Sequence, residues 1–450
     1  MAGFHAAKRT HLLKTILRPF SISNSSDWKN VHAVVFESDD WGFCGENKNP
    51  SSSERLARLG YELRGKGSGD SYYNTLEKTE DLENLYEVLS SFSDGLGRHP
   101  VFTANFVVTN PDFERIKAGN FSEYHTIPIS LGFPKSWDSG KSLRQTWRSG
   151  IEKKVWMPEF HGYSHFNYQN WLKGLRKGDK KLRDFFEEEM IASSRDYPTL
   201  SEYVTNPGTG TFASRKEQSS TVSRGCEIFR FTFGYPARST IPPSDIWNID
   251  TEMAFLHSNL HYVQSERTRY SSALGLFRID FASTFNIVKS AILLLGPLTK
   301  LYRNVRLELN DDESEVLETS NYLFKIGSPV VVGTHRVNYV SGIDRNLAER
   351  GRKKLRTYLK AISEDSRTVF MTSSELYQIY TRGYSTAYYG SEVIVRNFTS
   401  SDISIPLKTQ RKYLQFDLTG DRMIDDSQYR GTGKLRIRAK KTLSFVPEGP

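Results

Sequence analysis

The chain has 450 residues, of which 37% are hydrophobic and 25% charged, and its mean hydropathy is −0.53. This is the composition of a folded globular protein, and it excludes a wholly disordered chain, a fibrous repeat and a bundle of membrane helices. The formal net charge of +9 is concentrated at the two ends of the chain. Residues 1–30 hold five Lys or Arg against one Asp, and residues 385–450 hold eleven Lys or Arg against seven Asp or Glu.

Short apolar runs alternate with helical patterns through most of the chain. Strands are predicted at residues 31–36, 101–108, 155–160, 228–233, 260–263, 330–333 and 369–372, and helices at 75–91, 168–177, 181–194, 312–325, 345–362 and 374–381. This alternation predicts an α/β protein, with a parallel sheet that is covered by helices and is either open or closed into a barrel. Residues 206–225 are rich in Gly, Ser and Thr and are predicted to form a loop.

The sequence also bears on compartment and partners. Cys44 and Cys226 are too few for a disulfide framework or a four-thiolate metal site, and they suit a reducing compartment. Residues 1–20 lack the apolar core of a secretory signal, and the apolar stretch 290–298 is shorter than a membrane-spanning helix. We therefore expect a cytoplasmic protein without a transmembrane segment. The basic ends suit peripheral contact with an anionic surface such as the inner membrane face, or serve solubility, and no motif predicts a nucleic-acid partner.

An acidic pair follows the first predicted strand, in the run ESDDWG at residues 37–42. Neighbouring side chains of a regular strand point to opposite faces, so Asp39 and Asp40 can serve one site only where the strand ends and the backbone turns. Gly42 favours such a turn. Active sites of parallel α/β folds gather at the carboxyl ends of the strands. The pair is therefore either a metal ligand with a neighbouring base, or a helix cap or surface turn.

Two histidines with a spacing of four follow the predicted strand at residues 155–160, in the run HGYSHFN. His161 and His165 can face one point, and two imidazoles with one carboxylate leave room for water, as at a catalytic zinc site. His257 and His261 have the same spacing, but they lie where a predicted helix passes into a weak strand, with no acidic pair nearby. We expect this second pair to serve packing.

A third strand end carries His335, directly after the predicted strand at residues 330–333. Three strand ends thus present Asp39 and Asp40, His161 and His165, and His335. Random placement would seldom produce this pattern. It predicts that five side chains from distant stretches of the chain meet around one divalent cation.

These motifs resemble those of the polysaccharide deacetylases of carbohydrate esterase family 4, and their sequences are most similar to those of a bacterial branch. The likeness rests on the runs SDDWG, EFHGYSHFN with Trp171 following, and GTHRVNY, and it spans about residues 30–380. It implies a distorted (β/α) barrel of about seven strands over residues 31–383. Outside this span, the charge marks residues 1–30 as a basic N-terminal segment, and strand-like stretches broken by turn clusters predict a small all-β appendage at residues 385–450.

The resemblance implies a role for each of the five side chains. Asp39 matches the catalytic base, and His335 matches the late histidine that acts as general acid. Asp40, His161 and His165 match the metal ligands. The implied cofactor is a divalent metal, with zinc expected and cobalt or nickel as alternatives.

Two parts of the family pattern are only loosely matched. The family's Arg-x-Pro-Tyr run corresponds to FGYPAR at residues 233–238, so either Arg230 or Arg238 is expected to orient Asp39. The family's fourth motif contains an Asp and a Trp, for which Asp245 and Trp247 are the candidates. Substrate choice depends on these parts of the chain.

Aromatic residues make up 13% of the chain, and several lie around the first two motifs. Sugar rings stack on aromatic faces, so Trp41 is expected to contact substrate, although packing is an equal alternative. Tyr235 and Arg238 are expected to contribute to substrate binding, with backbone N–H groups near Tyr235 holding the oxyanion.

The implied activity is removal of acetyl groups, N- or O-linked, from a glycan or glycan precursor, with a metal-bound water as nucleophile. A related amide hydrolase, such as a deformylase, is one alternative. A non-catalytic glycan-binding protein on the same scaffold is another. A serine hydrolase is not expected, because the chain has no Gly-x-Ser-x-Gly motif. The sequence leaves the oligomeric state open.

Overall fold

The computed structural model describes residues 28–63 (except 29 and 46), 72–137, 143–206, 209–265, 297–389 and 392–406, and the strand segments 268–271, 276–279, 413–417, 423–424, 434–437 and 442–447. The basic residues 1–27 and most of the apolar stretch 290–298 lie outside the described residues. Among the helices that are described, none has the length and apolar character needed to cross a bilayer.

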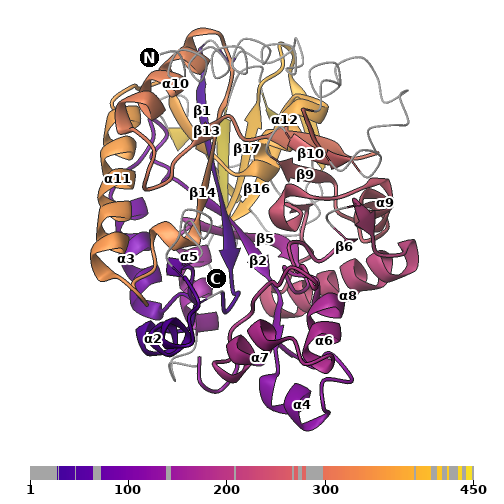
Figure 1. The fold of residues 1–450 in the computed structure, drawn as a ribbon. Coiled ribbons are helices and arrows are strands. Elements are labelled where there is room, and N and C mark those ends of the chain that lie inside the picture. The colour runs from indigo at the N-terminus through magenta and orange to yellow at the C-terminus, as the bar shows by residue number, and fades with distance from the viewer. Residues whose placement is uncertain are drawn as a thin grey trace.

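A parallel sheet of nine strands forms the centre of the molecule (Figure 1). Eight strands follow one another in the order β12-β9-β8-β5-β2-β1-β14-β13, and β15 joins at the start of β1. All of its strand pairs are parallel. The strands are β1 (His32–Trp41), β2 (Phe102–Val107), β5 (Trp156–Gly162), β8 (Ser239–Thr240), β9 (Tyr262–Ser265), β12 (Thr299–Tyr302), β13 (Val305–Arg306), β14 (Val330–His335) and β15 (Thr368–Met371).

The sheet curls into the predicted distorted (β/α) barrel. Its two outermost strands, β12 and β13, are separated in sequence only by residues 303 and 304, so the chain links one end of the strand order to the other. In Figure 1, α3, α5 and α11 lie on one side of β1, and α8 and α9 lie on the other. The helices are α2 (Pro50–Arg58), α3 (Thr79–Ser90), α4 (Phe113–Ala118), α5 (Leu143–Glu152), α6 (Tyr168–Arg176), α7 (Lys180–Glu187), α8 (Arg215–Phe233), α9 (Ile249–His257), α10 (Glu313–Lys325), α11 (Arg345–Ser363) and α12 (Ser373–Arg382).

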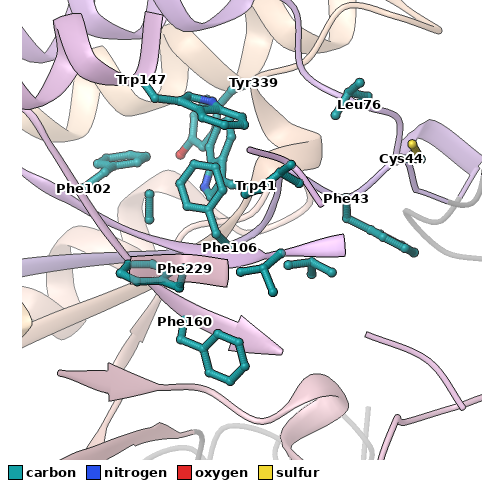
Figure 2. Packing of buried hydrophobic residues seen from close by; sticks show 14 of the residues in the cluster. Trp41, Phe43, Cys44, Leu76, Phe102, Phe106, Trp147, Phe160, Phe229 and Tyr339 are labelled. Atoms are coloured by element: carbon teal, nitrogen blue, oxygen red, sulfur yellow. The ribbon is translucent and has the colours of Figure 1, made fainter. Parts of the chain in front are cut away.

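Aromatic side chains fill much of the space between the sheet and its helices (Figure 2). Trp41 of β1 packs edge-to-face on Trp156 of β5, with ring centroids 4.6 Å apart. Phe106 of β2 packs in the same way on Trp147 of α5, at 4.9 Å. Such pairs add about 0.5–1.5 kcal/mol beyond the burial of their area. The aromatic core therefore fixes how β1, β2 and β5 lie against one another, and these strands carry the motif residues.

The predicted strand at residues 228–233 is wrong, because this segment is the end of α8. The helix starts at a capping box in which the side chains of Ser214 and Glu217 each accept the other's backbone N–H, and it ends at Gly234 with φ 82°. These two signals could have identified the helix from the sequence. The helix also takes up part of residues 206–225, which were predicted to form a loop. Small strands β6 (Val204–Asn206) and β7 (Thr211–Phe212) precede it.

The C-terminal part of the chain folds into antiparallel strands. Five of them form a sheet in the order β16-β17-β22-β19-β20, and β18 pairs with β21. Their bounds are β16 (Tyr384–Tyr389), β17 (Glu392–Asn397), β18 (Ile403–Pro406), β19 (Tyr413–Asp417), β20 (Met423–Ile424), β21 (Lys434–Ile437) and β22 (Thr442–Pro447). Further antiparallel pairs are β3 (Thr109–Pro111) with β4 (Thr126–Pro128), and β10 (Thr268–Ser271) with β11 (Leu276–Ile279).

Two ion pairs join the C-terminal sheet to the barrel, and one of them is more deeply buried than the other. Arg396 of β17 donates from Nε to Glu375 of α12 at 3.2 Å, and Arg98 donates to the same carboxylate oxygen at 3.0 Å. These three side chains are buried. Lys154 and Glu392 form the second pair, in which the lysine side chain is 45% exposed. The buried cluster makes the sheet part of the barrel's packing.

We expect Arg396→Met to lower the free energy of unfolding by about 3 kcal/mol, because removing one partner of a buried ion pair leaves a desolvated charge less well compensated. Lys154→Met is the matched control in the exposed pair and is expected to cost less than about 1 kcal/mol. Equilibrium urea unfolding of the full chain measures both. An equally small loss for the two variants would show that the buried cluster does not hold the sheet in place.

Candidate active site

Side chains from the carboxyl ends of β1 and β5 meet at one point. Asp40 Oδ1 lies 3.3 Å from His161 Nε2 and 3.2 Å from His165 Nε2. One ligand atom from each of the three residues lies within 4.8 Å of the others, and this is the cluster of metal-ligating type found among the described residues. The three side chains that the sequence predicts as metal ligands are thus brought together.

A bulge in β1 allows the neighbouring residues Asp39 and Asp40 to face the same site. The pairing of β1 with β2 shifts between Ser38 and Trp41, and Asp40 has the left-handed φ of 73°. This backbone turns Asp40 toward the site that Asp39 also faces, although β1 continues through Trp41 and does not end at the pair. Gly42 follows with φ 74°, and a Cβ there would lie 2.9 Å from Phe106 Cδ1.

The two histidines are held in defined orientations. The pairing of β2 with β5 shifts so that His161 is the extra residue on β5. Its Nδ1 lies 2.8 Å from the carbonyl oxygen of Ile241, which can only accept, so Nδ1 donates to that oxygen and Nε2 faces Asp40. His165 has φ 68°, and its ring stacks on that of Phe43 with centroids 5.1 Å apart.

This donor set fits a divalent transition metal. Ligand atoms about 2.0–2.1 Å from a tetrahedral metal lie about 3.3 Å from one another. The separations of Asp40 Oδ1 from His161 Nε2 and His165 Nε2 match that spacing. Desolvation would raise the pKa of Asp40, but hydrogen bonds with the two histidines hold it well below its usual value. The carboxylate is therefore ionised and able to bind a cation.

Asp39 lies beside this cluster and is held by a buried arginine. Arg303 donates to both carboxylate oxygens of Asp39 at 2.6 Å, and Asn105 donates to Oδ1 at 2.8 Å. Burial would raise the pKa of Asp39, but the Arg303 guanidinium outweighs burial and lowers it to about 2. Glu37 accepts from Nε of the same arginine at 2.9 Å, so the guanidinium is fixed on both sides.

His335 reaches the site from the end of β14. Its Nε2 lies 3.7 Å from Asp39 Oδ2, and its Nδ1 bonds Glu308 Oε1 at 2.7 Å. Desolvation opposes charge on the ring, but the carboxylates of Glu308 and Asp39 raise the pKa of His335 well above its usual value. Both ring nitrogens are therefore protonated at neutral pH, and Nε2 can donate its proton.

Two residues of the site, Arg303 and Glu308, lie outside the sequence motifs. Arg303 takes the place that was expected for Arg230 or Arg238, and this expectation is wrong. Arg230 is exposed on α8, and the Arg238 side chain contacts His261 at 3.1 Å. Arg303 lies between β12 and β13 and Glu308 follows β13, in a stretch without an apolar run that would have marked a strand end.

The expected substrate contacts do not lie at the site. Trp41 is 1% exposed and packs in the aromatic core (Figure 2), with its indole N–H donated to Ser38 Oγ. Tyr235 precedes β8 and donates its hydroxyl to the carbonyl oxygen of Pro158, near the start of β5. Arg238 also precedes β8. These three expectations are corrected, because the first residue is buried and the other two lie toward the amino ends of the strands.

The remaining candidates have structural contacts. Asp245 accepts from Ser265 Oγ at 2.9 Å, and the buried Trp247 donates its indole N–H to Glu252 at 2.8 Å. His261 precedes β9 and lies next to Arg238, and burial and the arginine both lower the pKa of its ring. The rival histidine pair therefore lies at the opposite end of the strands from Asp40, as expected for a pair without a ligand role.

Comparison of the chain with protein-family models and with curated proteins finds no match. Solved structures do resemble it. A 4-alpha-glucanotransferase from Thermococcus litoralis has 10% identity and a TM-score of 0.37, over 78% of this chain and 41% of that one, so the chain spans less than half of that protein. A candidate polysaccharide deacetylase from Mycobacterium smegmatis has 12% identity and a TM-score of 0.36, over 79% and 92% of the two chains.

A pseudoenzyme of carbohydrate esterase family 4 from Bacillus anthracis has 9% identity and a TM-score of 0.33, over 77% of this chain and 66% of that one. Members of the family that the sequence motifs resemble are thus among the similar solved structures. At TM-scores of 0.37 and below, the fold of this chain rests on its own strand order.

Proposed function

We propose that this chain is a metal-dependent hydrolase of the polysaccharide deacetylase type, which removes N- or O-linked acetyl groups from a glycan or glycan precursor. One observation carries the proposal. Asp40, His161 and His165 form a three-ligand cluster, and Asp39 lies beside it with His335 at 3.7 Å. A base, an acid and a metal position side by side are what hydrolysis of an acetyl bond requires. The SDDWG, HGYSHFN and GTHRVNY motifs support the same family type.

Asp40, His161 and His165 are the proposed ligands of the metal, for which we favour zinc, with cobalt or nickel as alternatives. When bound, the metal supplies Lewis acidity that polarises the acetyl carbonyl and lowers the pKa of an attacking water. Asp39 accepts the proton of that water as the new C–O bond forms. Because Arg303 lowers the pKa of Asp39 to about 2, the carboxylate is ionised throughout the neutral range.

His335 provides the proton for the leaving group. As the bond between the acetyl carbon and the glycan nitrogen or oxygen breaks, the protonated ring donates to that atom, which leaves as an amine or hydroxyl. Glu308 supports this role because its carboxylate accepts from Nδ1 and keeps Nε2 free to donate. The products are acetate and the deacetylated glycan.

Two free cysteines support a reducing compartment such as the cytoplasm, where thiols persist. Cys44 is buried, and Cys226 is partly buried on α8. The basic residues 1–30 and 385–450 suit contact with an anionic surface such as the inner membrane face. We propose acetylated carbohydrate as the substrate and no nucleic-acid partner.

Acetate release from N-acetylated and O-acetylated oligosaccharides tests the proposed activity, with and without a chelator. We expect release that is lost on chelation and restored by Zn²⁺, Co²⁺ or Ni²⁺. Formate release from formylated substrates instead of acetate release would favour the related amide hydrolase. Metal-independent glycan binding with no release of either acid would favour a non-catalytic binding protein and contradict the proposal.

A further inference from the structure

A buried glutamate binds the loop that carries His165. The backbone N–H groups of Tyr163, Ser164 and His165 donate to the Glu202 carboxylate at 3.2, 2.7 and 3.0 Å. Successive N–H groups that turn toward one centre form an anion-binding nest, and the left-handed His165, with φ 68°, is part of this one. Glu202 is 6% exposed, so its contacts with the loop are shielded from water.

A second buried glutamate binds the turn that follows Asp40. The N–H of Gly42 donates to both carboxylate oxygens of Glu77, at 3.1 and 3.3 Å. Glu77 is 1% exposed. The N–H of Phe43 donates to the carbonyl oxygen of Asp40 at 3.4 Å, which closes the turn between them. The Glu77 carboxylate thus holds the backbone just after the left-handed Asp40.

Arg336 connects Glu77 to the rest of the site. Its guanidinium is fully buried and donates to Glu77 at 3.0 Å and to Asn74 Oδ1 at 2.6 Å. Asn74 in turn donates to Asp40 Oδ2 at 3.4 Å. The arginine neutralises the Glu77 carboxylate and orients the amide that contacts the oxygen of Asp40 not shared with the histidines.

From these contacts we propose that Glu77 and Glu202 are positioning residues of the metal site, each fixing the left-handed backbone that presents one ligand, Asp40 or His165. The proposal rests on the proposed function. Left-handed φ values are unfavourable for residues other than glycine, so these two ligands would relax away from the site unless other contacts held them. Neither glutamate is placed to bind the metal itself, because both carboxylates are occupied by backbone N–H groups. Each acts through the ligand that it positions.

Titration of the full-length apoprotein with Co²⁺ tests the proposal, by calorimetry and by the visible absorption of the bound ion. We expect Glu202→Gln and Glu77→Gln each to raise the Kd for Co²⁺ by about 10-fold or more, as for other outer contacts of metal ligands, and to change the absorption spectrum. Glu375→Gln is the matched control, since this buried glutamate also accepts a backbone N–H, from Thr372 at 2.9 Å, but lies away from the site. Its Kd and spectrum are expected to equal those of the wild type.

If a glutamine variant fails to fold, Glu202→Asp replaces it, because the shorter side chain keeps the charge but cannot reach all three N–H groups. Wild-type Kd and spectrum in the Glu202 and Glu77 variants would overturn the proposal and leave the proposed function intact. An equal rise in Kd for Glu375→Gln would also overturn it, by showing a general effect of lost stability. A wild-type chain that binds no Co²⁺ would instead contradict the proposed function on which the inference rests.

Discussion

Asp39→Asn is expected to lower the rate of acetate release by about 10²–10⁴-fold while the protein still binds one equivalent of metal. The amide cannot accept a proton from water, yet its oxygen still accepts hydrogen bonds from Arg303 and Asn105, which hold the native carboxylate. The metal ligand Asp40 and its backbone are untouched. Steady-state rates on the best oligosaccharide, together with metal content by elemental analysis, measure the two effects separately.

A matched control for this variant is Asp81→Asn. Asp81 is also a buried aspartate, and it accepts from Lys78 N–H and from Ser341, away from the metal ligands. Its substitution is expected to leave the rate unchanged. An Asp39→Asn protein with full metal content that kept more than about a tenth of the wild-type rate would remove Asp39 from the role of base.

The second large effect is expected for His161→Ala, which should abolish metal binding and with it all acetate release. The imidazole is one of three ligands, and among the described residues no fourth His, Cys, Asp or Glu side chain belongs to this cluster. Removal of an outer contact of a metal ligand lowers metal affinity by about 10–100-fold, and the loss of a ligand should lower it further. Equilibrium dialysis against Zn²⁺, followed by elemental analysis, measures it.

The chain provides its own control for this experiment. His257 and His261 have the spacing of His161 and His165, but they lie at the other end of the strands, with His261 beside Arg238. His257→Ala and His261→Ala should therefore bind metal as the wild type does. Full metal content in His161→Ala, or loss of metal in either control, would contradict the assignment of the ligands.

Much of the fold and of the candidate site could be predicted from the sequence, for reasons visible in β1, β5 and β14. Each of these strands is a buried apolar run, and each ends in the polar residues that the motif analysis selected. Parallel strands bring such ends to one edge of the sheet, so the meeting of Asp39, His161 and His335 follows from topology.

Other parts of the site could not be predicted, because their partners are distant in sequence. Arg303 binds Asp39 although the two residues are 264 positions apart in sequence. No pattern around Arg303 distinguishes it from the other arginines of the chain. Trp41 was expected at the substrate because it follows the aspartates, but the bulge that turns Asp40 into the site leaves Trp41 in the core. The left-handed φ of Asp40 decides that Asp40 faces the site and Trp41 the core, and residue type alone does not predict this angle.

The central place of β1 has a consequence for how the protein is made. Val34 of β1 pairs with Val330 of β14 and with Phe370 of β15, so this first strand of the sheet emerges from the ribosome long before two of its neighbours. Contacts between residues so far apart in sequence slow folding and prolong the exposure of apolar segments. During synthesis the nascent chain must therefore keep the apolar residues 33–36 of β1 from aggregating until residue 371 has been translated, and we expect its yield in cells to depend on chaperones.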